Sequence, residues 1–414
     1  MKLGIEGDAA GRFVGDILAS AEGGQYDPAL AKMLAAHCTE DVEWLMEQTS
    51  LSISKVAHLG GHSHPRTHRV PDKDDRTPVP VGFTIMAALI NAVTSQKEFK
   101  ERLIIRVDCE VLSLRQDPKS NEISGVVLRE AGQAPQTHPC DAVVLTTGGF
   151  GNDHSPDSLL HEFSPQLKSY PTTHGDFATG DGIKMGRAVG GELVDMARVL
   201  VHPIGFIDPH HPDHKTKHLG PEALRVSGFV LIEPKTGNRF ANEIDRLDNI
   251  SDAINNLGVE YPGSGGSRFA FCLLGPKGIE LFGPAISFYR EKVGLFKDAT
   301  NLSEVARHVE CSEDALRKTL LAYDSAAAAK HCPHTGKTVF PCTIGVVGPF
   351  VVAAVSPCIH YNMGGLLINA AAEVQHRHCH GNPFLRGQDS IAGLFAAGEV
   401  SAGLHGKLRL GGNT

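Results

Sequence analysis

The sequence predicts an α/β protein of two domains, one inserted into the other. Helix-like and strand-like runs both occur before residue 200, and one apolar strand, "DAVVL", passes directly into "TTGGFG". A strand that ends in glycines is typical of an α/β sheet that meets a ligand at its carboxyl edge. After Val201 the texture changes to a stretch rich in His and Pro, "HPIGFIDPHHPDHKTKHLGPEAL". We therefore expect one domain at 1–200 and 356–414 and an inserted α+β domain at 201–355.

Three helices are expected in the first domain. The apolar spacing over residues 27–48 fits an amphipathic helix, with Asp27 as its N-cap and Pro28 in its first turn. The segment "PVGFTIMAALINAVTSQ" predicts a second helix. The segment "TGDGIKMGRAVGGELVDM" predicts a third helix, capped by Thr179 or Asp181 and ended by a Gly-Gly pair.

Three β-rich runs lie between the second and third of these helices. The first two, "RLIIRVDCEVLSL" and "EISGVVLREAG", are joined by a polar segment and predict a meander. The third is the "DAVVL" strand that enters glycines. In the inserted domain helical patterns dominate from Val305 to Ala329, and the first domain resumes with "HYNMGGLLINAAAEV".

Composition narrows the class of function. With 414 residues, 41% of them hydrophobic, the chain can bury a large core. A net charge of -8 offers no basic face, so we expect no nucleic-acid partner and favour a small molecule. Apolar runs are too short for a membrane span, and the N-terminus lacks the order of a signal peptide, so an intracellular chain is expected. Nine cysteines without a CxxC pair indicate reduced thiols.

The C-terminal stretch "LFAAGEVSAGLHGKLRLGGNT" resembles the start of a ligand loop. An apolar strand passes into glycines, and glycine lets backbone N–H groups approach a ligand without a side chain in the way. A helix normally follows such a loop and completes the anion site with its free N–H groups. Here the sequence stops at Gly411-Gly412-Asn413-Thr414. We therefore expect half of a site.

Candidate chemistry lies in segments far apart in the sequence. Two histidines and several arginines give many hydrogen-bond donors and few acids, which suits an anion with carboxylates that arginine can grip in a fork. Glu222 and Arg225 are three residues apart, so on a helical turn they share a face and could pair or relay a proton. From the residues alone, a solvated ion pair and ordinary core or loop histidines are the favoured interpretation of this pattern. The candidates are His202, Glu222, Arg225, Arg246, His360 and Arg409.

Two histidine clusters have ligand-type residues. Neither shows the paired spacing of a zinc site, and both are flanked by Pro and Gly, so we expect solvated loops and no metal. The clusters are His376, His378, Cys379 and His380, and His210, His211 and His214. The segment "GHSHPRTHR" could be either a basic surface loop or a loop beside a cofactor.

Read together and in order, these segments resemble the flavoprotein fold of the soluble fumarate reductases, in the succinate dehydrogenase and fumarate reductase family. The matching phrases include "LGGHSHPRTHR", "VVLTTGGFGND", "VHPIGFIDP", "GNRFANEIDRLDNISDAI" and "HYNMGGLLIN". They extend from about residue 27 to the end, and the resemblance is strongest to single-chain enzymes of yeasts and trypanosomatids. The resemblance implies a doubly wound (Rossmann-like) FAD-binding domain and an inserted capping domain.

The resemblance also implies roles for single residues. His202, His360 and Arg409 would hold the two carboxylates of fumarate, and Arg246 would be the general acid. Glu222 and Arg225 would pass protons to Arg246, and flavin N5 would supply the hydride that completes succinate. FAD contacts are implied at Gly60, Gly61, Thr147, Gly148, Gly149, Asp181, Glu399, Gly411 and Gly412.

Departures from the family pattern shape further expectations. No Gly-x-Gly-x-x-Gly turn precedes Asp27, so the first strand, turn and helix of the doubly wound domain are expected to be missing, and so is the helix after the last glycines. Pro221 stands where a threonine is usual, and Leu408 where an asparagine is usual. We therefore expect a chain truncated at both ends that binds FAD weakly.

Two other functions stay open at this point. One is a catalytically silent truncated homologue that binds FAD poorly, and the other is a different FAD-dependent dicarboxylate oxidoreductase such as L-aspartate oxidase. The chain contains no second nucleotide fingerprint, so NADH would act only through a donor module or sequence outside it. The expected compartment is open between cytoplasm, mitochondrion and a glycosome-type organelle.

Overall fold

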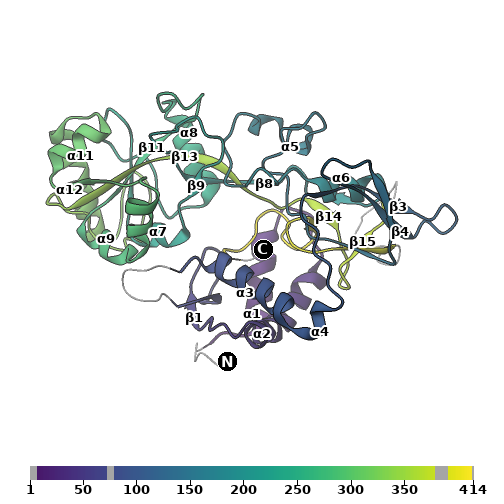
Figure 1. Cartoon of the computed structure of the whole chain (residues 1–414). Helices are drawn as coiled ribbons and strands as arrows, with labels where there is room; N and C mark the ends of the chain where they lie inside the picture. The colour runs from purple at the N-terminus through teal and green to yellow at the C-terminus, as the bar shows by residue number, and fades with distance from the viewer. Residues whose placement is uncertain (1–6, 72–78, 378–389, 413–414) are drawn as a thin grey trace.

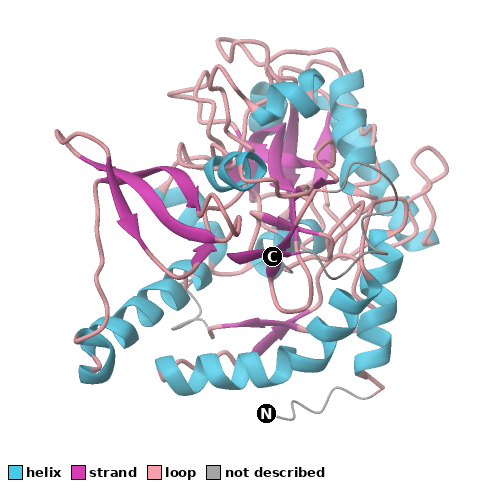
Figure 2. Ribbon diagram, turned by 90° about the vertical axis from the view of Figure 1, so that its right-hand side faces the viewer, coloured by secondary structure: helices cyan, strands magenta, loops and turns pink. Residues whose placement is uncertain are grey.

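The computed structural model describes residues 7–71, 79–377 and 390–412. Two lobes lie side by side in Figure 1, with a layer of N-terminal helices beneath them. Figure 2 shows the same helices along the lower side of the molecule. Within the described ranges, no helix combines the length and apolar character that a bilayer crossing needs.

The N-terminal layer consists of helices and one short hairpin. The side chain of Asp27 accepts a hydrogen bond from the backbone N–H of Ala29 at 2.8 Å, and Pro28 is the first helical residue, so the first predicted helix is confirmed. The second predicted helix is confirmed too, although none of its described residues is buried. The elements are α1 (Ala10–Ala21), α2 (Pro28–Thr49), β1 (Lys55–Ala57), β2 (Thr67–Arg69), α3 (Val81–Ser95) and α4 (Lys97–Lys100).

The N-terminal helices also hold the last loop of the chain. Phe13 and Ile17 of α1 and Ala31 and Ala35 of α2 form a small apolar core around Leu410, which is 2% exposed. Burying a leucine side chain contributes roughly 1.5–3 kcal/mol to stability. This packing therefore holds the backbone on both sides of Leu410 in place.

The lobe that carries α6 in Figure 1 contains three small sheets. The predicted meander is confirmed, because β3 (Cys109–Gln116) and β4 (Ile123–Glu130) pair antiparallel. A third strand, β5 (Gln136–Pro139), was not predicted, because its sequence "QTHP" is polar. The other strands are β6 (Val143–Leu145), β15 (Glu373–Gln375) and β16 (Ser390–Ala396) in one sheet and β7 (Leu193–Val194), β14 (Gly365–Leu367) and β17 (Ser401–Ala402) in another.

The third predicted helix is present as α6 (Asp181–Ala188), but its predicted cap is wrong. The N-cap is Gly180, at a φ of 73° that glycine adopts without strain, and no side chain caps the helix. Thr179 instead donates its hydroxyl hydrogen bond to the carboxylate of Asp181 at 2.9 Å. The same lobe contains α5 (Leu159–Phe163) and a 3₁₀ turn at Pro165–Leu167.

The second lobe is built on an antiparallel sheet that is covered on both faces. Alternate residues of its strands point to opposite sides, so Leu231 and Cys272 join one core while Val230 and Leu273 join the other. Its strands are β10 (Val230–Ile232), β11 (Ala270–Leu274), β13 (Phe350–Asn362), β8 (Val199–Phe206) and β9 (His218–Leu219), with β12 (Lys297–Ala299) also paired to β13.

Helices of the second lobe divide between the two faces of that sheet. α11 (Leu302–Val309) and α12 (Glu313–Ala329) cover one face, which agrees with the helical pattern predicted there. The other face packs against α7 (Glu222–Val226), α8 (Leu247–Asn256), α9 (Pro276–Phe282), α10 (Ala285–Ser287) and the π-helical turn Phe288–Lys292.

Strands β8 and β13 connect the two lobes. They pair antiparallel from Phe206 opposite Val355 to Val199 opposite Asn362, and Figure 1 shows them running from one lobe to the other. Both expected domain boundaries, at 200/201 and at 355/356, fall inside these strands. The division into 1–200 with 356–414 and 201–355 therefore stays our interpretation, and the strands at its edge belong to both lobes.

Candidate active site

A β-bulge brings two histidines together between the lobes. In the β8–β13 ladder Ile359 pairs with Val201 and Tyr361 with Leu200, which leaves His360 as the extra residue. A bulge bends its strand and re-aims the side chain at that position. The rings of His202 and His360 lie edge to face with centroids 5.4 Å apart.

His202 is buried and its proton position is fixed by its neighbours. Its Nδ1 accepts a hydrogen bond from the backbone N–H of Ile204 at 3.1 Å. The ring is neutral in the fold because burial lowers the pKa of His202, although Glu222 opposes this shift. Nε2 therefore carries the proton and faces Oε1 of Glu222 at 3.5 Å.

His360 contacts one residue at each ring nitrogen. Nδ1 lies 2.8 Å from the hydroxyl oxygen of Thr173, and Nε2 lies 3.3 Å from a guanidinium nitrogen of Arg409. Burial, with the nearby His202 and Arg409, lowers the pKa of His360 to about 3. The guanidinium carbon of Arg409 also lies 4.6 Å from the centre of the Tyr361 ring.

Glu222 and Arg225 form the ion pair that their spacing predicted. Both are on α7, and NH1 of Arg225 lies 3.1 Å from Oε2 of Glu222. Burial alone would raise the pKa of Glu222, but hydrogen bonding to His202 and the charge of Arg225 outweigh it and lower the pKa to about 2. Arg225 also donates hydrogen bonds to the carbonyl oxygens of Glu243 and Asp245.

The Glu222–Arg225 pair should make the free energy of unfolding depend on pH in the acid range. Its pKa falls from 4.5 to about 2 on folding, so Glu222 binds a proton on unfolding in this window, and stability rises with pH there. The contribution of Glu222 is complete above pH 4.5 and is lost as pH falls through about 2. Urea unfolding between these limits should show a smaller pH dependence for Glu222→Gln than for the wild-type chain. Equal slopes would contradict the pairing.

Arg246 lies outside this cluster. Its side chain is 52% exposed and pairs with Asp248 at 2.6 Å at the start of α8. Arg246 lines a cavity of about 340 Å³ together with residues that include Val201 and Leu408. Of the six candidate side chains, the structure therefore brings together His202, Glu222, Arg225, His360 and Arg409.

Two parallel strands end in open glycine backbone. Gly148 follows β6 and Gly398 follows β16, with φ values of 76° and 82°, and a Cβ at either position would contact nothing within 4 Å. Asp181, the first residue of α6, lies close to this edge. The next residue shows this, because a Cβ at Gly182 would lie 2.2 Å from the hydroxyl oxygen of Thr147, which directly precedes Gly148. This open edge beside a helix N-terminus suits a polar cofactor with phosphates, such as FAD.

Gly149 and Glu399 have a different role in the structure. A Cβ at Gly149 would lie 2.6 Å from the side-chain oxygen of Asn362 and 2.7 Å from the carboxylate of Glu399, so glycine is needed for protein packing. Glu399 accepts a hydrogen bond from the backbone N–H of Asn362 at 2.8 Å and lies 3.3 Å from Nε2 of His174. The side-chain nitrogen of Asn362 is buried without a hydrogen-bond partner.

The remaining glycine loops pair with each other. The N–H of Gly411 donates to the carbonyl oxygen of Gly60 at 2.8 Å, and a Cβ at Gly61 would contact Leu410 at 2.6 Å. A Cβ at Gly412 would meet the side chain of Thr67 at 2.8 Å. A Cβ at Gly60 would have only Oε2 of Glu222 within 4 Å, at 3.9 Å. The last loop thus brings exposed glycine backbone next to the histidine and arginine cluster.

Sequence reasoning missed several residues of this site. Thr173, His174 and Asn362 contact the predicted residues only through the fold, and no spacing in the sequence connects them. His405 lies with its ring centroid 6.0 Å from that of Tyr361, and burial lowers its pKa to about 4. In the sequence, the one signal that could have indicated His405 is its position in the glycine-rich C-terminal stretch.

No metal centre is seen in the described ranges. Among those residues, no three His, Cys, Asp or Glu side chains are grouped to hold an ion. The rings of His211 and His214 stack with centroids 4.6 Å apart. His378, Cys379 and His380 lie outside the described residues.

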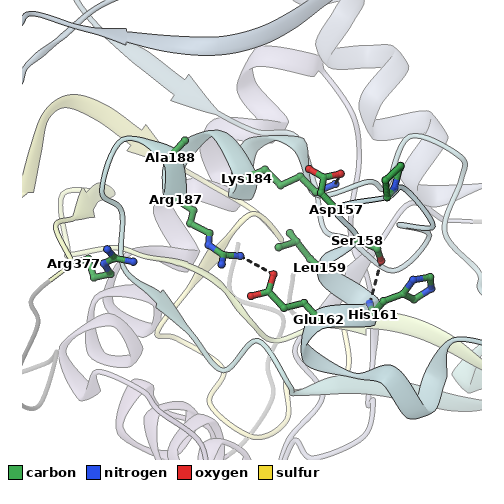
Figure 3. Close-up of a pocket in the computed structure, with 10 residues that line it drawn as sticks. Asp157, Ser158, Leu159, His161, Glu162, Lys184, Arg187, Ala188 and Arg377 are labelled. Carbon is green, nitrogen blue, oxygen red and sulfur yellow. Dashed lines mark hydrogen bonds and ion pairs between the residues drawn. The ribbon is translucent and has the colours of Figure 1, made fainter.

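A larger cavity of about 720 Å³ is lined by residues of α5 and α6 and by Arg377 (Figure 3). Lys184 in its wall is paired with Asp157 at 3.2 Å, and Arg187 with Glu162 at 2.8 Å. Because these cations are neutralised by protein carboxylates, we assign no ligand to this cavity.

The chain is similar to known FAD-binding proteins over nearly its whole length. The family model described as "FAD binding domain" matches residues 5–414. Fumarate reductase of Schizosaccharomyces pombe is 33% identical over 98% of this chain and 74% of its own length, and fumarate reductase 1 of Saccharomyces cerevisiae is 33% identical over 98% and 82%. The open conformation of a flavocytochrome c3 fumarate reductase superposes with a TM-score of 0.75, 26% identity and coverage of 99% of this chain and 64% of that one.

The fold and these matches define the class of protein as an α/β flavoprotein oxidoreductase. The chain belongs to the FAD binding domain family and is an enzyme of the fumarate-reductase-like group within it.

Proposed function

We propose that the chain reduces fumarate to succinate with FAD as its cofactor. One observation carries the proposal: the bulge at His360 and the last loop assemble His202, His360, Arg409 and Glu222 beside open glycine backbone. His202, His360 and Arg409 in this cluster can donate hydrogen bonds to carboxylates from several directions. The names of the relatives support fumarate as the acid.

The protein residues divide into three roles in this proposal. His202, His360 and Arg409 hold and orient the substrate carboxylates, which stabilises the negative charge that develops during reduction. Glu222 and Arg225 pass a proton toward Arg246, and Arg246 donates it to the substrate carbon. Arg225 ties α7 to the segment that carries Arg246, because it donates a hydrogen bond to the carbonyl oxygen of Asp245, the residue before Arg246. In this role the Arg246 side chain leaves Asp248 and turns toward the substrate.

FAD would be held by the open glycine positions and the acidic residues near them. Gly148 and Asp181 lie at the carboxyl edge of the β6–β16 pair, and Gly60 and Gly411 lie beside the substrate cluster. When bound, FAD supplies the hydride. NADH as the reductant, a separate electron donor module and the compartment stay predictions.

Two observations favour other candidates. Among the described residues β6 has one strand neighbour, and Val144 on it is 61% exposed, which favours a chain that binds FAD poorly. Pro221, the N-cap of α7, offers the substrate no hydroxyl, so a different dicarboxylate stays a candidate, as in an L-aspartate oxidase.

Two measurements on the purified chain separate these candidates. Flavin absorbance per protein chain gives the FAD occupancy, and succinate formed from fumarate with a reduced dye gives the activity after FAD is added. We expect succinate formation from fumarate and no oxidation of L-aspartate. A chain that stays without flavin at saturating FAD, or a chain that oxidises L-aspartate, would overturn the proposal.

A further inference from the structure

Thr173 is placed to set the proton position on His360. Its hydroxyl oxygen lies 2.8 Å from Nδ1 of His360 and 3.3 Å from the carbonyl oxygen of Ile359, and its backbone N–H donates to the same carbonyl at 2.8 Å. Thr173 is therefore fixed to strand β13 next to the bulge. A hydroxyl both donates and accepts, so it can serve either form of the neutral ring.

The neighbours of His360 define the form present in this structure. A guanidinium only donates, so Nε2, which lies 3.3 Å from Arg409, must accept. His360 is neutral because its pKa is lowered to about 3. Nδ1 then carries the proton and donates it to Thr173, whose hydroxyl hydrogen points to Ile359.

A carboxylate at the same place requires the opposite form. Carboxylate oxygens only accept, so Nε2 must carry the proton when it holds one. Nδ1 then has to accept, and the Thr173 hydroxyl rotates from Ile359 to donate to it. One proton leaves Nδ1 for water and one is taken up at Nε2, so the charge of the ring is unchanged.

We propose that Thr173 is a positioning residue that allows His360 to exchange tautomers when a carboxylate binds. The inference rests on the proposed function for the identity of the acid, but not for the state of the free protein. Without the hydroxyl, a buried Nδ1 acceptor has no donor, and a missing partner of this kind weakens binding by roughly tenfold.

The test uses Thr173→Val, which keeps the shape of the side chain, and Thr173→Ser, which keeps the hydroxyl. Nitrogen-15 NMR of histidine-labelled protein, assigned with His360→Gln, should show Nδ1 protonated in the free wild-type chain and Nε2 protonated with succinate bound. We expect Thr173→Val to lose this exchange, with KM for fumarate raised about tenfold and kcat little changed. Thr173→Ser should restore both. Thr216→Val, on a neighbouring exposed threonine, is the matched control and should match wild type.

Each result bears on the inference. Nε2 protonated in the free chain, or bound succinate without exchange, would overturn it, and so would wild-type behaviour of Thr173→Val. If calorimetry shows that succinate does not bind the wild-type chain, the proposed function fails instead, and acetate replaces succinate as the carboxylate in the NMR experiment.

Discussion

Replacing Arg246 with alanine is expected to abolish fumarate reduction, a loss of about three orders of magnitude or more. The reason is the role proposed for Arg246 as proton donor to the substrate carbon, which no other described arginine could take over from the same loop. Stability should change little, because the Arg246–Asp248 pair is half-exposed and such pairs contribute about 0–1 kcal/mol. The measurements are succinate formation with a reduced dye and urea unfolding of the same preparation.

Arg268→Ala is the matched control for this experiment. Arg268 is 39% exposed and pairs with Glu260 at 3.2 Å, so it resembles Arg246 in exposure and partner but lies outside the proposed site. It should retain full activity. If Arg246→Ala keeps activity comparable to that of the control, Arg246 is not the acid. If both variants lose activity together with their folded state, the loss reports unfolding, and the urea curves show this.

Replacing Lys337 with methionine is expected to cause the largest loss of stability, about 3 kcal/mol. Nζ of Lys337 lies 2.7 Å from Oε2 of Glu243, and both side chains are buried. Arg239 also contacts Glu243, and together the two cations keep the pKa of Glu243 below its ordinary value although burial opposes this. Methionine removes one of these cations and leaves a buried carboxylate poorly compensated. The measurement is the free energy of unfolding in urea.

Lys277→Met is the control for Lys337→Met. Lys277 pairs with Glu280 at 2.8 Å, the same kind of contact, but its side chain is 53% exposed. We expect a change of no more than about 0.5 kcal/mol, because solvent screens an exposed pair. Equal losses in the two variants would show that burial does not decide the value of the Lys337–Glu243 pair.

Local patterns in the sequence were sufficient for many elements. Asp27 and Pro28 marked the start of α2, and polar residues between two β-rich runs marked the β3–β4 hairpin, because caps and turns depend on a few adjacent residues. The cap of α6 was wrong because a glycine with positive φ can begin a helix without a side-chain acceptor. The strand β5 was missed because edge pairing with β4, not its own composition, makes it a strand.

The candidate site shows the same division. The residue types indicated donors for an anion, and the resemblance of the ordered sequence phrases to the fumarate reductases nominated His202, His360 and Arg409 for its carboxylates. Only the structure showed that His360 is the bulged residue of β13 and that Thr173 contacts its other nitrogen. Arg246, nominated with equal weight, is held by Asp248 outside the cluster.

By itself the sequence determined the α/β class, the main helices and strands, and the kinds of residue that could hold an acid. The tertiary structure alone decided which of them meet, how Gly60 and Gly411 join, and which tautomer His360 adopts. The physical reason is range. Helix caps and turns are fixed within a few residues, whereas these contacts join segments that are tens to hundreds of residues apart and depend on how β8, β13 and the last loop pack.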